Sequence, residues 1–182
     1  MNNKNILKYS GLISRKDRKI NPTESILYGI VTGEALFPQF YSKRQGTQAL
    51  YGLRRYKFIR RTKVADSDSY RHSATSKGEE RLRRIILDEI EIKIPRRWDG
   101  KWRLVMYDLP IRFKKARDAF RWKLKNMGFF QFQKSAWIYP YPCEKEVLFV
   151  ADFYGVRKHI EILEVNKVLH EEKLKKHFEV CD

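Results

Sequence analysis

Residues 98–110, WDGKWRLVMYDLP, constrain the fold of this chain more than any other stretch. Asp99-Gly100 is a turn signal, and residues 104–107 form a short apolar run that is typical of a buried strand. Pro110 ends such a strand because proline has no N–H to donate to a neighbouring strand. These features predict a junction between two units at residues 98–101, a buried strand after it, and Asp108 at the strand's end.

The segment before this stretch predicts a small helical unit with a hairpin. Apolar residues at helical spacing follow Thr23, a short helix is expected around residues 39–42, and a basic helix follows it. Two strands then flank a polar turn, and a last helix runs from Thr75 to about Ile90. This order is that of a winged helix-turn-helix, in which one helix enters the major groove of DNA.

The expected boundaries follow from these patterns. A basic arm takes residues 1–22, and the winged helix-turn-helix takes residues 23–92. The strands of its hairpin are expected at 58–64 and 70–74. The basic helix spans about 42–57, and its apolar face comprises Ala49, Leu50, Leu53 and Tyr56.

The net charge of the chain favours a polyanion as partner. Lys and Arg number 39 against 22 Asp and Glu, which gives +17, and the excess is concentrated before Trp98. An anionic membrane is less suited, because the cations do not lie on one long amphipathic helix. Double-stranded DNA is the expected partner, and RNA and a solvated basic face on an interaction module are the alternatives.

Side chains of the basic helix are the candidates for reading bases. Arg and Gln can form paired hydrogen bonds with guanine and adenine respectively, and the residues of this kind are Arg44, Gln45 and Gln48. Phosphate contacts position a protein without specifying sequence. The other nucleic-acid-binding candidates, all basic, are Lys43, Arg54, Arg55, Lys57, Arg60, Arg61, Lys63 and Arg71.

The remainder of the chain predicts a second unit with the order βαββαβ. After the strand that starts at Trp102 come a helix at 112–127, strands at 129–135 and 136–140, a helix at 143–154 and a strand at 160–165. This order predicts an α+β protein whose second domain, 102–166, is an antiparallel ferredoxin-like sheet with two helices on one face. A linker at 93–101 precedes it. An amphipathic helical tail, 167–182, follows it with Val168, Leu169, Leu174 and Phe178 as its apolar residues.

The helix at 112–127 also carries a strongly charged face. Its cations include Lys115, Lys123 and Lys125. Such a face is usually only solvated, and the alternative is that it adds to a path for nucleic acid. Aromatic residues of the second unit can stack on bases, although packing within the core or a dimer is the more ordinary use. These residues are Trp102, Trp122, Phe129, Phe130, Phe132 and Trp137.

Several other classes of function have no support in the sequence. It has no apolar run of membrane-spanning length and no apolar signal core near Met1. Its two cysteines form no CxxC pair, and no glycine-rich phosphate loop or dinucleotide motif occurs. A cytoplasmic protein without a required cofactor is therefore expected.

Motifs spaced along the second unit resemble one known family. Residues 98–110, 115–122 (KARDAFRW), 128–129 and 133–143 (QKSAWIYPYPC) closely resemble the phenylacetate-catabolism repressor (PaaX-like) family. The central domain of that family is similar to the small CRISPR-associated adaptation nuclease of the Cas-two type. The resemblance covers residues 98–166 strongly, and it extends more weakly over 23–90 as the family's winged helix-turn-helix.

The resemblance implies a homodimer that regulates transcription. Cas-two-type domains pair through their sheets, so a two-fold dimer would present two winged helices to a pseudo-palindromic DNA site. A repressor is the specific expectation, and its small-molecule effector is left open. The chain is shorter than a full repressor of that family, so a thioester inducer cannot be assumed.

Asp108 matches the strand-end aspartate of the family. In the nuclease branch, two copies of that residue face each other and bind a divalent metal such as Mg²⁺ or Mn²⁺. The chain departs from the repressor pattern at Ile111, where an acidic residue is usual. Asp108 is thus the one catalytic and metal-binding candidate. The structural alternative is that it caps the next helix or pairs with Arg112. A metal-dependent nuclease and a non-cleaving DNA-bridging subunit are the alternative functions.

Overall fold

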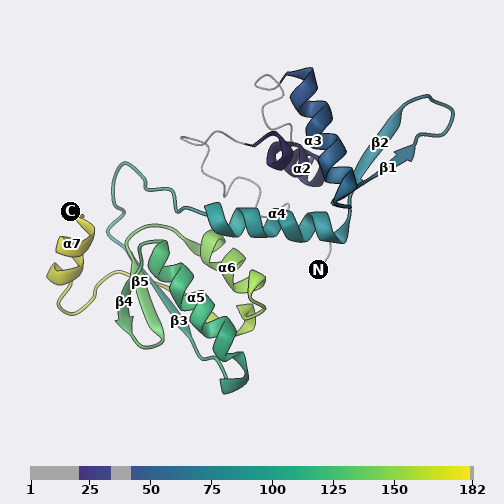
Figure 1. The fold of residues 1–182 in the computed structure, drawn as a ribbon. Helices are drawn as coiled ribbons and strands as arrows, with labels where there is room; N and C mark the ends of the chain where they lie inside the picture. Colours follow the sequence, from purple (N-terminus) through teal and green to yellow (C-terminus); the bar gives the residue numbers. More distant parts are fainter. Residues whose placement is uncertain (1–20, 34–41, 181–182) are drawn as a thin grey trace. The chain divides into compact units, whose positions relative to one another are not determined.

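The computed structural model describes residues 21–33 and 42–180, which divide into two compact units between Glu89 and Ile90 (Figure 1). The expected basic arm lies outside the described residues except for Asn21 and Pro22. The short helix expected around 39–42 also lies outside them except for Ser42, which caps the following helix. None of the described helices is long and apolar enough to cross a membrane.

In its described residues, 21–33 and 42–89, the first unit has three helices and a hairpin. In chain order these are α2 (Pro22–Thr32), α3 (Lys43–Arg55), β1 (Ile59–Lys63), β2 (Tyr70–Ala74) and α4 (Ser76–Glu89). The strands pair antiparallel, with Ile59 opposite Ala74 and Lys63 opposite Tyr70. Apart from the segments that are not described, the elements follow the predicted order.

Helix α2 begins one residue before the predicted start at Thr23. The side chain of Asn21 accepts a hydrogen bond from the Thr23 backbone N–H at 2.9 Å. Pro22 fits the first helical position because its missing N–H would have no partner there. Asn21 is therefore the N-cap of α2, and Pro22 is its first residue.

Apolar faces of the three helices form the core of the first unit. Helix α2 contacts both α3 and α4. The apolar residues that these helices bury include Leu27, Tyr28, Val31, Ala49, Leu53, Leu82, Ile85 and Ile86, and Ile59 of β1 is also buried. Tyr56, predicted on the apolar face of α3, is instead 61% exposed. Helix α3 ends at Arg55, so Tyr56 leaves the helical spacing that would have turned it inward.

The second unit contains a four-stranded antiparallel sheet with the order β4-β5-β3-β6. Its elements are β3 (Trp102–Tyr107), a 3₁₀ turn (Ile111–Phe113), α5 (Lys114–Asn126), β4 (Phe130–Gln133), β5 (Ala136–Tyr139), α6 (Glu144–Phe153), a second 3₁₀ turn (Arg157–His159), β6 (Ile160–Val165) and α7 (Glu172–Phe178). The predicted βαββαβ order is therefore present, and the fold is mixed α+β with two antiparallel sheets. Figure 1 shows α5 and α6 side by side over the sheet.

The two faces of the sheet are covered differently. Side chains alternate along β3, and on one face Tyr107 packs edge-on against Phe120 of α5 with ring centroids 5.7 Å apart. On the other face Trp102 and Ile138 form a buried cluster with Leu174 of α7 and Val180. We call this second surface the open face, because α7 covers only the end near Trp102.

The C-terminal segment differs from the predicted tail. A helix was expected to bury Leu169, but α7 begins only at Glu172 and Leu169 is 81% exposed. His170 has φ 63°, in the left-handed region, which interrupts a helix at that point. The segment is nevertheless packed against the sheet, since Leu174 and Val180 are buried.

Lys123 of α5 was predicted on the charged, solvent-facing side of the helix. In the structure it is buried, with only 6% of the residue exposed. The fully buried residues Phe120 and Leu124 lie on the inward stripe of α5. Lys123, three residues after Phe120, falls on the same stripe. The helical repeat thus decides its position despite its charge.

Candidate nucleic-acid interface

The outer surface of α3 presents one row of exposed side chains. Arg44, Gln48, Tyr51 and Arg55 are spaced i, i+4, i+7 and i+11, so they lie along one face of the helix. The opposite face is anchored by Ala49 and Leu53, which are buried in the core of the first unit. We call these four exposed residues the α3 row. Tyr51 is 63% exposed, and its place in the row follows from helical spacing alone.

Gln45 has a different task at the start of α3. Its Oε1 accepts hydrogen bonds from the backbone N–H of Ser42 at 2.9 Å and from the Ser42 hydroxyl at 3.1 Å. The Gln45 backbone N–H donates in turn to Ser42 Oγ at 3.2 Å. This reciprocal capping box fixes the first turn of α3. The amide oxygen that paired hydrogen bonding to adenine would need is already occupied.

The hairpin carries cations on both of its faces. Arg60 and Arg71 lie on the face opposite Ile59, while Arg61 and Lys63 lie on the same face as Ile59. Two of these cations are held by neighbours on β2. Arg60 Nε donates to the Ser73 hydroxyl at 3.1 Å, and the Arg61 guanidinium carbon lies 3.3 Å from the centroid of the Tyr70 ring. All four residues are exposed.

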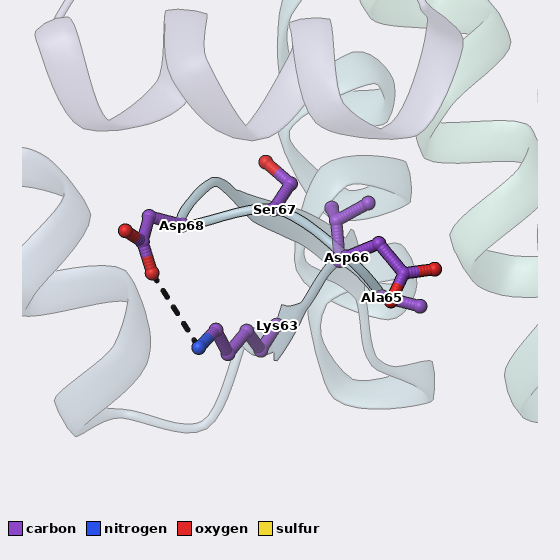
Figure 2. A pocket seen from close by; sticks show the side chains of 6 residues that line it. Lys63, Ala65, Asp66, Ser67 and Asp68 are labelled. Atoms are coloured by element: carbon purple, nitrogen blue, oxygen red, sulfur yellow. Dashed lines mark ion pairs between the residues drawn. The ribbon is translucent and has the colours of Figure 1, made fainter.

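The turn of the hairpin is acidic, unlike its strands. Figure 2 shows a hollow lined by residues 63–68, in which Lys63 faces Asp68 across an ion pair of 3.5 Å. Asp66 projects from the same turn and has φ 57°. Two carboxylates at the tip would repel phosphates, so the strands are the part of the hairpin suited to a polyanion. Sequence reasoning treated this segment only as a polar turn.

Almost all of the predicted cations lack an ion-pair partner among the described residues. Of the candidates, only Lys63 has an ion-pair partner within the described part of the chain. The others without a carboxylate partner there are Lys43, Arg44, Arg54, Arg55, Lys57, Arg60, Arg61 and Arg71. The structure brings these residues together on α3, at its C-terminal end and on the hairpin. Uncompensated cations of this density favour binding of a polyanion.

Asp108 lies at the end of β3 and is exposed. Its backbone N–H donates to the His159 carbonyl at 3.2 Å. Neither predicted structural role is found within the described residues. The next 3₁₀ turn has no side-chain cap, and the Arg112 guanidinium lies 5.1 Å from the Phe113 ring centroid rather than on Asp108. Those residues also contain no cluster of three or more side chains able to hold a metal.

The second unit contains a buried ionic group that sequence reasoning missed. Arg103 is 2% exposed, and its guanidinium makes two hydrogen bonds to the Asp99 carboxylate, at 2.8 and 2.6 Å. The guanidinium also donates to the Pro140 carbonyl at 3.2 Å and pairs with Glu164 at 3.5 Å. These hydrogen bonds hold the pKa of Asp99 below its usual range. The sequence signal that could have revealed this group is an arginine within an apolar strand, with an aspartate four residues before it.

Comparison with known proteins assigns the second unit. Residues 95–177 match the family model described as the PaaX protein central Cas2-like domain. The match runs from just before β3 into α7 and leaves the first unit outside. No curated protein matches the chain.

Proposed function

Because residues 95–177 belong to the PaaX central Cas2-like domain family, we propose that the chain is a transcriptional regulator that binds double-stranded DNA in a sequence-specific manner. Repression is its expected mode of action. The observation that carries this proposal is the α3 row, which sits beside a hairpin whose cations have almost no ion-pair partners. The first unit would then be a winged helix-turn-helix, with α3 as the recognition helix and β1–β2 as the wing.

In this proposal α3 enters the major groove and the hairpin follows the backbone. Arg44 would form a bidentate hydrogen bond with guanine, and Gln48 with adenine. Tyr51 lies between Gln48 and Arg55 on the α3 row and would contact a thymine methyl or a sugar. Arg54, Arg55, Lys57 and the strand cations would neutralise phosphates, which sets the affinity and its dependence on salt.

The open face of the second unit supports a homodimer. Met106 of β3 and Leu163 of β6 are 42% and 47% exposed, and both lie on that face beyond the end covered by α7. Phe132 on the edge strand β4 is 42% exposed. An exposed apolar patch of this kind marks an interaction surface. A two-fold dimer through it would present two copies of α3 to a pseudo-palindromic site.

The test is selection of duplexes from a randomised DNA pool, followed by binding measurements on selected and scrambled duplexes. The double variant Arg44→Ala/Gln48→Ala should lose about 10- to 100-fold of the preference for the selected duplex. Arg54→Ala is the matched variant. It should weaken binding of both duplexes equally and reduce the slope of log affinity against log salt concentration by about one. Unchanged preference in the double variant would exclude α3 as the reading element. Failure to select any duplex would exclude the proposed function.

A nuclease is the second candidate, because the Asp108 carboxylate is exposed at the end of β3 in a Cas2-like domain. Mg²⁺ is commonly held by one or two carboxylates together with water and substrate phosphates, and the described residues of a single chain offer no group of three or more side chains that could hold a metal. Asp108 from each of two copies would supply a pair of carboxylates for the metal.

The nuclease is tested by incubating labelled DNA and RNA with the protein in Mg²⁺, Mn²⁺ or EDTA. The regulator predicts intact nucleic acid in all three buffers and unchanged duplex binding by Asp108→Asn. Metal-dependent cleavage that Asp108→Asn abolishes would replace the regulator with the nuclease. Salt-sensitive binding with neither preference nor cleavage would favour a DNA-bridging subunit.

A further inference from the structure

The outer face of α5 exposes a large aromatic side chain, that of Trp122. Trp122 is 62% exposed, and its indole makes no hydrogen bond or ring contact within that part of the chain. The helix itself is firmly anchored, since Phe120 and Leu124 on its inner face are fully buried. A rigid helix therefore holds a large aromatic ring in solvent.

Several cations that have no carboxylate partner in the described part of the chain lie on the same face as this ring. Lys115 lies seven residues before Trp122 and Lys125 three residues after it, so both lie beside Trp122 on the outer face. Arg121 and Lys114 flank them. None of these four cations has a carboxylate partner among the described residues. The acidic residue on this face, Asp118, pairs with Arg117 at 3.7 Å. The face thus combines one aromatic platform with uncompensated positive charge.

We propose that the outer face of α5 binds a single-stranded segment of nucleic acid. An unpaired base would stack on Trp122, and the phosphates on either side would contact Lys115, Lys125 and Arg121. Aromatic platforms within positively charged surfaces bind single strands without sequence preference, because every base has a π-face. A duplex keeps its bases stacked on one another, so it would meet only the cations. This surface belongs to the second unit and does not depend on the α3 row.

The test measures binding of a labelled oligothymidylate by fluorescence anisotropy. All proteins carry Arg44→Ala/Gln48→Ala, so the result is separate from the duplex binding proposed for α3. Trp122→Ala should weaken binding of the oligothymidylate by about 5- to 100-fold, and Trp122→Phe should retain most of it. Heparin, a polyanion without bases, should bind Trp122→Ala as well as the parent protein.

The cations are tested with two matched pairs. Lys115→Ala/Lys125→Ala should weaken binding of both the oligothymidylate and heparin. Lys173→Ala/Lys176→Ala, which removes two exposed cations of α7, should change neither by more than about twofold. Because all these side chains are exposed, thermal unfolding should remain unchanged in every variant.

Two results would overturn the proposal. One is equal binding of the oligothymidylate by Trp122→Ala and its parent. The other is self-association in sedimentation that Trp122→Ala abolishes, because this would identify the face as a contact between copies of the chain.

Discussion

At the scale of single residues, Arg103 joins parts of the second unit that are distant in sequence. Its guanidinium contacts Asp99 in the turn before β3, the carbonyl of Pro140 after β5, and Glu164 on β6. A buried guanidinium is unfavourable unless its donors are satisfied. The strongest partner of the guanidinium is Asp99, which accepts two charge-assisted hydrogen bonds from it.

Replacement of Asp99 should therefore destabilise the second unit in a pH-dependent manner. We expect Asp99→Asn to lower the free energy of unfolding by about 1–2 kcal/mol at pH 7, which allows for the partial exposure of the carboxylate. The pKa of Asp99 is lowered in the folded state. Its stabilisation is thus present above the unfolded value of about 3.9 and lost as the pH falls through the folded value.

Urea unfolding followed by tryptophan fluorescence at pH 7 and at acidic pH measures this effect. The difference between wild type and Asp99→Asn should shrink as the pH falls, and Asp118→Asn on the outer face of α5 serves as the control. A difference of the same size at both pH values would assign it to something other than the charge of Asp99.

A glycine in α4 matters through close packing. The N-terminal turn of α4 lies against the end of α3 and the start of β1, where Thr75 donates its backbone N–H to the Phe58 carbonyl at 2.9 Å. A Cβ atom on Gly78 would overlap that same carbonyl oxygen. Because backbone atoms cannot move aside as a flexible side chain can, only glycine fits this position.

Gly78→Ala should destabilise the first unit by about 1–3 kcal/mol. Gly52→Ala is the matched change, since a Cβ atom on Gly52 of α3 meets nothing within 4 Å. It should stabilise the unit by roughly 0.5–1 kcal/mol through helix propensity. Urea unfolding monitored by circular dichroism distinguishes the two. Equal effects of both substitutions would show that the contact with Phe58 is not limiting.

At the scale of elements, α7 is part of the second unit's core rather than an appended tail. The rings of Phe178 and Trp102 have centroids 6.0 Å apart, and Leu174 is 3% exposed. Without α7, the apolar side chains of Trp102 and Ile138 would face water on the open face. The helix is short, so this burial rather than its own propensity stabilises it.

Two leucines of the C-terminal segment test this conclusion. Leu174→Ala should lower the free energy of unfolding by about 2–5 kcal/mol, because it leaves a cavity beside Trp102. Leu169→Ala should change it by less than about 0.5 kcal/mol, since Leu169 is a surface residue. Tryptophan fluorescence of the folded state should shift to longer wavelength only in Leu174→Ala. Similar losses in both variants would contradict the packing described for α7.

Elements could be predicted from the sequence where one signal dominates. Strand β6 was expected at 160–165 and occupies those residues, where each residue pairs with one of β3. Gly128 follows α5 and Gly155 follows α6. Both have a positive φ, which glycine adopts without strain. Local pattern and tertiary structure agree at these positions.

Other positions could not be predicted because two physical effects compete there. The charge of Lys123 argued for the surface, but the helical repeat places it inside. The amide of Gln45 is suited both to recognition of adenine and to capping of a helix N-terminus. In the structure it caps α3. The exposure of Leu169 depends on the left-handed backbone of His170, which residue type alone does not indicate.

At the scale of the whole molecule, association is the property on which the proposed function depends most. The uncovered part of the open face carries Met106 and Leu163. A lysine introduced there would place a charge in any interface that this face forms, and burial of an unpaired charge is strongly unfavourable.

Leu163→Lys should therefore raise the dissociation constant of the proposed dimer by at least about tenfold. Analytical ultracentrifugation over a range of concentrations measures the shift. Leu169→Lys, at the more exposed leucine, should leave association unchanged. A dimer that persists in Leu163→Lys would assign the contact to another surface.

Under the proposed function, the length of the α3 row limits how much sequence one copy of the chain can distinguish. From Arg44 to Arg55 the helix rises about 16 Å, which corresponds to about five base pairs along a DNA strand. By chance, a given run of five base pairs recurs about once in 10³, whereas ten recur about once in 10⁶, the lower end of the number of competing sites in a genome. Recognition of a unique site in a genome would thus need at least two copies of α3 acting together, and pairing of the sheets would supply the second copy.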